Sequence, residues 1–140
     1  MILPDVNILV YAHRPEMPHH KKVVKTLQNL PKQFQTLCLS QFIICGFLRI
    51  VTSPKIFKQP TSGPEAFKFI DTLMDSPSTK IVEPSENFWG IFKIISQETS
   101  AKSAFFSDVY IAALAIEHNL DLFTFDTDFK KFSSLSLYQA

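Results

Sequence analysis

Short apolar runs alternate along this chain with longer segments whose apolar residues recur at helical spacing, and this alternation is the strongest constraint on the fold. It is typical of α/β proteins, because parallel strands need a long crossover connection that is usually a helix. We therefore predict an α/β fold with a central parallel sheet. The expected strands cover residues 2–5, 36–39, 80–83 and 121–125, and the helices between them include residues 41–51, 65–74, 86–97 and 108–118.

The chain has 140 residues, which is enough for one compact core, and its hydrophobic fraction of 46% argues against disorder. No repeat, low-complexity tract or polar linker divides it, so we expect a single domain over residues 1–140. Its longest apolar runs, such as residues 42–47, are far shorter than the roughly 20 residues that span a bilayer. The N-terminus has no basic segment before an apolar stretch. We expect a soluble, cytoplasmic protein that does not bind membranes.

The formal net charge of +1 neither requires nor excludes a polyanionic partner. Local basic clusters are more informative, although each alone is explained most simply as a solvated surface. The two cysteines, Cys38 and Cys45, lack the spacing of zinc ligands. The basic clusters comprise residues 19–25 with two histidines and three lysines, then Lys55 with Lys58, and finally Lys130 with Lys131.

Four aspartates fall beside the ends of predicted elements. Asp5 closes the first strand, Asp108 begins a helix, and Asp126 and Asp128 follow the last strand. Functional sites of open α/β sheets form beyond the carboxyl ends of the strands, so these residues can converge there. Helix caps and turns explain part of the same pattern. Asp5 is harder to explain as a cap, because it directly follows an apolar strand and has no cationic neighbour.

Carboxylates that converge in one pocket repel one another unless a cation neutralises them. A hard divalent ion such as Mg²⁺ or Mn²⁺ suits oxygen ligands. Such an ion can activate water and stabilise the charge on a phosphodiester during in-line attack. The spacing therefore favours a metal-dependent site, and scattered caps and turn residues are the alternative.

The order and separation of several segments resemble PIN-domain ribonuclease toxins of the VapC family over about residues 2–137. Single pieces such as "FDTDF" are weakly specific, but the ordered set is strong. The segments are "PDVNILVYAHRPEMPHH", "FLRIVTSPKIF", "KIVEPSENFW" and "SDVYIAALAIEHNLDLFTFDTDF".

This resemblance implies a PIN-like three-layer α/β/α sandwich with a central parallel sheet. It also implies a Mg²⁺- or Mn²⁺-dependent endoribonuclease toxin that cleaves structured RNA, with transfer RNA as the expected substrate. The implied partners are a cognate VapB-type antitoxin, whose C-terminal segment occupies the active-site groove, and a second copy of the chain in a homodimer.

The resemblance also carries over a set of site residues. It implies that Asp5, Asp108 and Asp126 hold the metal, and that Asp128 completes the catalytic set. Asn7 is expected to support the first aspartate, and Ser107 is expected to cap the active-site helix. Arg49 is expected to contact phosphate or to neutralise neighbouring carboxylates. Arg14 is the only other arginine and is a second candidate for the phosphate contact.

One position departs from the family pattern, because Gly46 stands where the family has a glutamate. Glycine inside a helix costs about 1 kcal/mol relative to alanine. The predicted helix places Gly46 on a polar stripe with Arg49, apart from the apolar face that carries Ile43 and Phe47, so packing on that face does not explain the glycine. We expect the remaining aspartates to bind metal weakly and turnover to be reduced, unless a nearby residue replaces the missing acid.

Two other functions stay open at this point. A catalytically dead PIN-fold binding module would retain antitoxin or RNA binding without turnover. An aspartate-based phosphatase is a weaker alternative, because "DVN" lacks a second aspartate two residues after Asp5.

Overall fold

The computed structural model describes all 140 residues and contains one four-stranded parallel sheet in the order β3-β2-β1-β4. The predicted α/β fold with a central parallel sheet is confirmed. Each strand has only three residues and is shorter than predicted; in β1 the difference is Asp5, which caps the helix that follows. The strands are β1 (Ile2–Pro4), β2 (Leu37–Leu39), β3 (Thr79–Ile81) and β4 (Asp121–Phe123).

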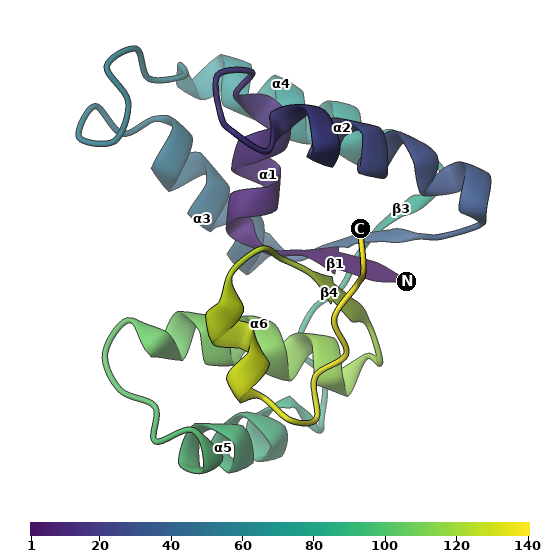
Figure 1. Cartoon of the computed structure of the whole chain (residues 1–140), viewed down its shortest axis with the longest axis vertical. Helices are drawn as coiled ribbons and strands as arrows, with labels where there is room; N and C mark the ends of the chain where they lie inside the picture. Colours follow the sequence, from purple (N-terminus) through teal and green to yellow (C-terminus); the bar gives the residue numbers. More distant parts are fainter.

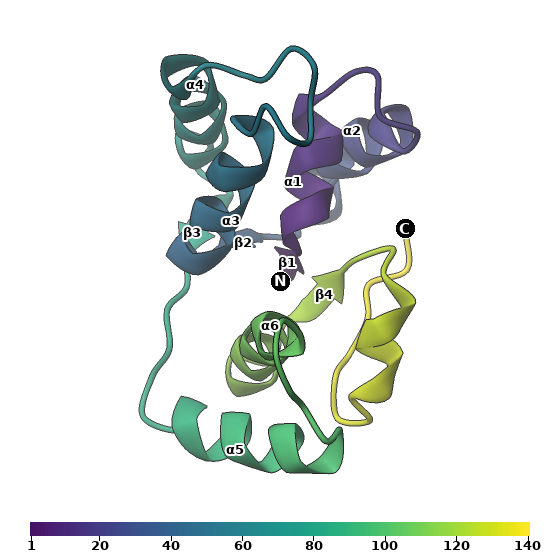
Figure 2. The ribbon, with the colours of Figure 1, turned by 90° about the vertical axis from the view of Figure 1, so that its left-hand side faces the viewer.

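Helices cover both faces of this sheet and make the predicted three-layer sandwich (Figures 1 and 2). Helices α1 to α4 lie on one face, and α5 and α6 lie on the other, with the C-terminal segment beside them. No helix combines the length and the apolar composition needed to cross a bilayer. The helices are α1 (Val6–His13), α2 (His20–Asn29), α3 (Gln41–Val51), α4 (Gly63–Met74), α5 (Phe88–Glu98) and α6 (Phe105–Glu117), with 3₁₀ helices η1 (Pro31–Gln33) and η2 (Thr127–Lys131).

The core lies at the sheet, whose two central strands are fully covered. The side chains of β1 and β2 are buried, and α6 contributes the buried run from Ile111 to Ala115. Three alanines in that run are completely buried. Such small side chains let a helix approach its neighbours closely, so α6 packs between the sheet and α5.

Helix starts agree only partly with the sequence prediction. Ser40 caps α3 by accepting a hydrogen bond from the Ile43 amide at 3.4 Å. The prediction that Ser107 caps a helix was wrong, because α6 begins two residues earlier, at Phe105. The ring of Phe105 stacks on Phe132 with centroids 5.4 Å apart. This packing anchors the first turn of α6 and leaves Ser107 inside it.

The end of α6 is tied to the segment that leads from β3 to α5. The Glu117 side chain is only 4% exposed. Its carboxylate accepts hydrogen bonds from the backbone amides of Ser85 at 2.8 Å and Asn87 at 2.9 Å. His118 Nε2 lies 2.8 Å from the carbonyl oxygen of Glu83. These bonds fix α5 and α6 relative to the sheet, and so fix the helix that carries Asp108.

Replacing this carboxylate should destabilise the fold. We expect Glu117→Ala to lower the free energy of unfolding by about 2 kcal/mol, because two amides lose a charged acceptor. Glu117→Gln keeps one acceptor oxygen and should cost less. Urea denaturation measures both, with Glu98→Ala at the exposed end of α5 as the control. Equal stability of Glu117→Ala and the control would contradict this role.

Candidate functional site

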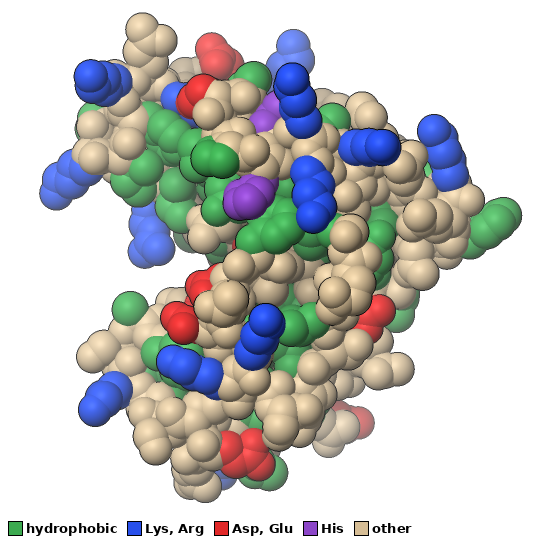
Figure 3. Space-filling model, in the orientation of Figure 1, with side chains coloured by type: hydrophobic (Ala, Val, Ile, Leu, Met, Phe, Trp, Pro, Cys, Tyr) green, Lys and Arg blue, Asp and Glu red, His purple; other side chains and the backbone are tan.

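A pocket of about 300 Å³ opens where the carboxyl ends of β1 and β4 meet α3 and the start of α6. The space-filling view shows a cleft between the two halves of the molecule with acidic side chains at its rim (Figure 3). The pocket holds all the predicted site positions except Asp128. They are Asp5, Asn7, Gly46, Arg49, Ser107, Asp108 and Asp126.

Asp5 is the most enclosed of these acids, at 4% exposure. One carboxylate oxygen accepts a hydrogen bond from the Ile8 amide at 3.1 Å, so Asp5 caps α1. The other oxygen accepts one from the Thr124 hydroxyl. From the sequence, Asp5 was harder to explain as a cap, because the predicted strand included it; β1 ends one residue earlier and the chain turns directly into α1. Burial raises the pKa of Asp5, and the two hydrogen bonds oppose this rise.

Three other carboxylates lie close together, two of them in the pocket and the third, Asp128, beside it. Oxygens of Asp108, Asp126 and Asp128 lie within 4.8 Å of one another. The first turn of α6 supplies Asp108, Asp126 caps η2, and Asp128 lies in the first turn of η2. Asp126 accepts a hydrogen bond from the Asp128 amide at 2.9 Å. Burial, and then the neighbouring carboxylates, raise the pKa of Asp108 to about 6.

The chemistry of this donor set fits a hard divalent cation. Three carboxylate oxygens lie within reach of one ion, and its charge would relieve the repulsion that raises the pKa of Asp108. Lys131 is the only cationic side chain paired with the set, with its Nζ 3.6 Å from Asp128. Asp5 lies in the same pocket but outside this closest group. The metal set of Asp5, Asp108 and Asp126 therefore stays a prediction, beside the closer grouping that includes Asp128.

Thr124 is a site residue that sequence reasoning missed. Its hydroxyl donates to Asp5 and accepts a hydrogen bond from the Asp126 amide at 2.9 Å, so it connects two of the acids. Asn7 was expected to support Asp5, but its side chain makes no hydrogen bond and only its backbone amide acts on the Asp5 carboxylate. The sequence prediction placed Thr124 inside the strand 121–125, where the only signal was a polar residue within an apolar run. Thr124 is a positioning residue in this site.

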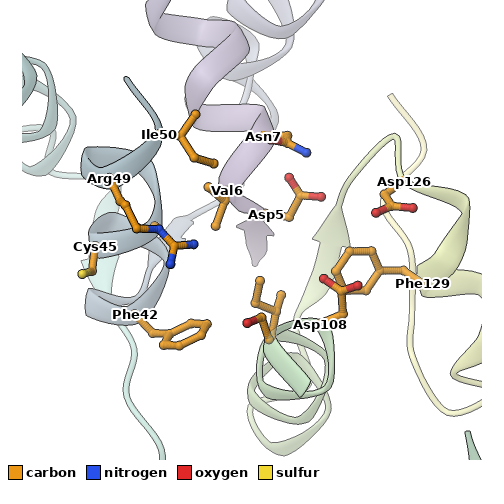
Figure 4. A pocket seen from close by; sticks show the side chains of 13 residues that line it. Asp5, Val6, Asn7, Phe42, Cys45, Arg49, Ile50, Asp108, Asp126 and Phe129 are labelled. Carbon is orange, nitrogen blue, oxygen red and sulfur yellow. The ribbon is translucent and has the colours of Figure 1, made fainter. Parts of the chain in front are cut away.

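The structure distinguishes the two arginines. Arg14 is fully engaged, because it bonds to Glu16 at 2.6 Å and to the Gln59 carbonyl oxygen at 2.9 Å, and its guanidinium lies 4.1 Å from the centre of the Phe57 ring. Arg49 makes no ion pair, and its guanidinium points into the pocket toward the aspartates (Figure 4). Arg49 is therefore the arginine that is free to bind an anionic ligand.

Gly46 packs directly against α1. A Cβ atom added to Gly46 would lie 2.9 Å from one methyl carbon of Val6 and 3.4 Å from the other. The first distance is shorter than real carbon contacts, and a β-branched side chain at the start of a helix has little freedom to move away. As expected, the apolar face of α3 does not restrict position 46. The contact comes from α1, across the edge of the pocket, and not from the apolar face of α3.

Comparisons with known proteins give a consistent result. The PIN domain family matches residues 2–135. Ribonuclease VapC43 of Mycobacterium tuberculosis is 32% identical over 135 residues, which cover 96% of this chain and 92% of the relative. VapBC2 from Rickettsia felis, solved with a DNA fragment from its promoter, has a TM-score of 0.76 at 21% identity and covers 99% of this chain and 98% of its own. FitAcB from Neisseria gonorrhoeae has a TM-score of 0.70 at 25% identity, with coverages of 99% and 97%.

Asp108 should make stability depend on pH in the absence of metal. Its pKa is about 6 in the folded protein against 3.8 for a free aspartate. The folded state therefore binds more protons between these values, and the free energy of unfolding falls as pH rises from about 4 to about 6. Asp108→Asn should flatten this decline. Thermal unfolding in EDTA across this range measures it, with Asp71→Asn on the exposed face of α4 as the control. If the free energy of unfolding of Asp108→Asn falls as steeply with pH as that of the unmodified protein, Asp108 does not cause this pH dependence.

The contact between Val6 and Gly46 predicts energetic coupling. In a Val6→Ala background, Gly46→Ala should stabilise the protein by about 1 kcal/mol, because alanine is the better helix former. With Val6 present, this gain should shrink or reverse, because the added methyl group meets the valine. A double-mutant cycle measured by urea denaturation isolates the coupling. The same effect of Gly46→Ala in both backgrounds would show that Val6 does not restrict position 46.

Proposed function

This chain belongs to the PIN domain family, in its VapC ribonuclease branch, and we therefore propose that it is a single-domain toxin that cleaves RNA with the help of a divalent metal ion. The observation that carries the proposal is the convergence of Asp108, Asp126 and Asp128 within 4.8 Å, with the first two of them in the pocket that also holds Asp5. Acids from three distant parts of the chain meet at the carboxyl edge of a parallel sheet, where open α/β folds place their sites.

The residues present would hold Mg²⁺ or Mn²⁺ through carboxylate oxygens. Asp108 and Asp126 contribute in either grouping of ligands, with Asp5 or Asp128 beside them. When bound, the ion supplies charge neutralisation and helps water to attack a phosphodiester in line. In that hydrolysis the water oxygen bonds to phosphorus and the bond from phosphorus to the leaving ribose oxygen breaks.

The chain's own residues would position the RNA and the acids. Thr124 and the Ile8 amide hold the Asp5 carboxylate in one orientation, so it needs little rearrangement during the reaction. Arg49 offers a planar guanidinium to a phosphate group, which it can bind through two parallel hydrogen bonds. Phe129, buried beside the acids, makes part of the wall apolar and strengthens electrostatic interactions within the pocket.

We propose that Gly46 attenuates this activity. Position 46 lines the pocket but brings no carboxylate to it, and Val6 occupies the space next to it. Position 46 therefore takes part in the packing of α1 against α3 and carries no acid. The same observation favours a second candidate function, a PIN-fold module that binds RNA or antitoxin without turnover.

The proposal extends to partners and location. The structural neighbours include VapBC2 of Rickettsia felis, which supports a VapB-type antitoxin that inhibits this chain. We further propose transfer RNA as the structured substrate, a homodimer as the working assembly, and the cytoplasm as the place of action.

RNA cleavage by matched variants tests this function. We expect Asp108→Asn to lose cleavage of a transfer RNA pool in Mg²⁺ or Mn²⁺, with an EDTA reaction as the blank. Val6→Ala/Gly46→Glu should cut about 10- to 100-fold faster than Val6→Ala, as for other carboxylates that support a metal. Gly46→Glu alone should gain less, because its Cβ atom meets Val6.

Two results would reject parts of this account. If the unmodified chain cuts as fast as Val6→Ala/Gly46→Glu, then Gly46 does not attenuate the enzyme. If cleavage persists in EDTA and in Asp108→Asn, then the acidic pocket is not the active site. RNA binding without cleavage by any variant would instead favour the binding module.

A further inference from the structure

A second hollow adjoins the acidic pocket, and Asp126 lines both. It encloses about 280 Å³ between α2, the residues that follow β4, η2 and the C-terminal segment. Two of the basic clusters seen in the sequence meet here, because Lys22 comes from the first and Lys130 from the third. The fold thus brings cations from distant segments to the edge of the proposed active site.

The two lysines of this hollow are free to bind an anion. Neither makes an ion pair, whereas the neighbouring Lys131 lies 3.6 Å from Asp128. Lys22 Nζ lies 5.4 Å from the centre of the Phe125 ring. Basic side chains also gather over α2 in the space-filling view, above the acidic rim of the cleft (Figure 3). The charge pattern changes from basic to acidic across the boundary between the hollow and the pocket.

Three aromatic rings line the same hollow, and two of them, Phe125 and Tyr138, are only half-buried and are held in place by their neighbours. The Phe125 ring stacks on His19, with centroids 4.3 Å apart and an angle of 26°. Tyr138 packs against Phe123 with centroids 5.4 Å apart and an angle of 62°. Rings fixed in this way can stack on a nucleobase without losing further conformational freedom.

We propose that this hollow binds the nucleotide next to the scissile phosphate in a single-stranded segment of RNA. This inference rests on the proposed function. Lys22 and Lys130 would contact the phosphates on either side of that nucleotide, while Phe125 and Tyr138 contact its base. The hollow suits one unstacked nucleotide and not a duplex, since proteins read single-stranded RNA by splaying out its bases onto aromatic rings. An acidic peptide would satisfy the lysines but would leave the rings without a partner.

Binding of a short RNA without metal tests the hollow separately from catalysis. The probe is a fluorescein-labelled ten-nucleotide oligouridine in EDTA, measured by anisotropy at several salt concentrations. We expect Lys22→Ala/Lys130→Ala to weaken binding at least tenfold at low salt, and to lower the slope of log K against log salt by about 1.4, or about 0.7 for each phosphate contact. Lys25→Ala/Lys32→Ala removes the same charge outside the hollow and should leave the slope unchanged.

A matched pair of variants tests the contribution of the aromatic rings. Phe125→Leu should weaken binding several-fold, because it keeps an apolar side chain but removes the stacking surface. Phe34→Leu changes a ring that is 98% exposed elsewhere and should have no effect. Thermal unfolding midpoints of all four variants confirm that each is folded at the temperature of the binding assay.

Several outcomes would overturn this inference. If both lysine double variants lose the same affinity for the oligouridine, the lysines attract RNA only through their general charge. Competition by a blunt RNA duplex as strong as that by oligouridine would reject single-stranded binding, and competition by polyglutamate at equal charge would reject a nucleotide site. If the Lys22/Lys130 variant binds normally while Asp108→Asn still abolishes cleavage, the hollow is rejected and the proposed function stands.

Discussion

The buried carboxylate of Asp5 is the constraint on which the site depends. It lies where β1 ends and α1 begins, and it accepts hydrogen bonds from the Ile8 amide and the Thr124 hydroxyl. Its own backbone amide bonds to the Phe123 carbonyl oxygen at 3.0 Å. One residue therefore starts a helix, joins two strands and places a carboxylate in the pocket. A carboxylate this buried is tolerated only because its oxygens are satisfied, and the same bonds fix where it points.

The rest of the pocket is arranged around unfavourable charge. Asp108, Asp126 and Asp128 repel one another, and this repulsion contributes to the raised pKa of Asp108. This repulsion does not stabilise the folded protein, so the clustered carboxylates indicate a functional site. A bound cation would neutralise the repulsion. Gly46 and Val6 form the opposite wall, where α1 and α3 pack closely. The site thus has clustered carboxylates that suit a cation on one side, and closely packed helices without an acid on the other.

The fold and the convergence of the acids could be predicted from the sequence, because both follow from local patterns. Alternating apolar periods indicate a parallel sheet, and strand ends place Asp5 and Asp126 at one edge. Features that depend on contacts between distant segments could not be predicted. Thr124 bonds to a residue 119 positions away, and the contact of Gly46 with α1 lies on a face that helical periodicity marked as free. Ser107 failed as a cap for a related reason, because aromatic packing set the start of α6.

Calorimetric titration of Mn²⁺ into the metal-free protein tests the central claim most directly, since it measures occupancy of the acidic pocket without depending on the choice of RNA. We expect one weak site near neutral pH, lost in Asp126→Asn and retained in Asp71→Asn. Because Asp108 titrates at about pH 6, binding should also weaken and release more protons as the pH falls toward that value. No measurable binding, or binding that survives Asp126→Asn, would contradict a metal-dependent site built from these aspartates.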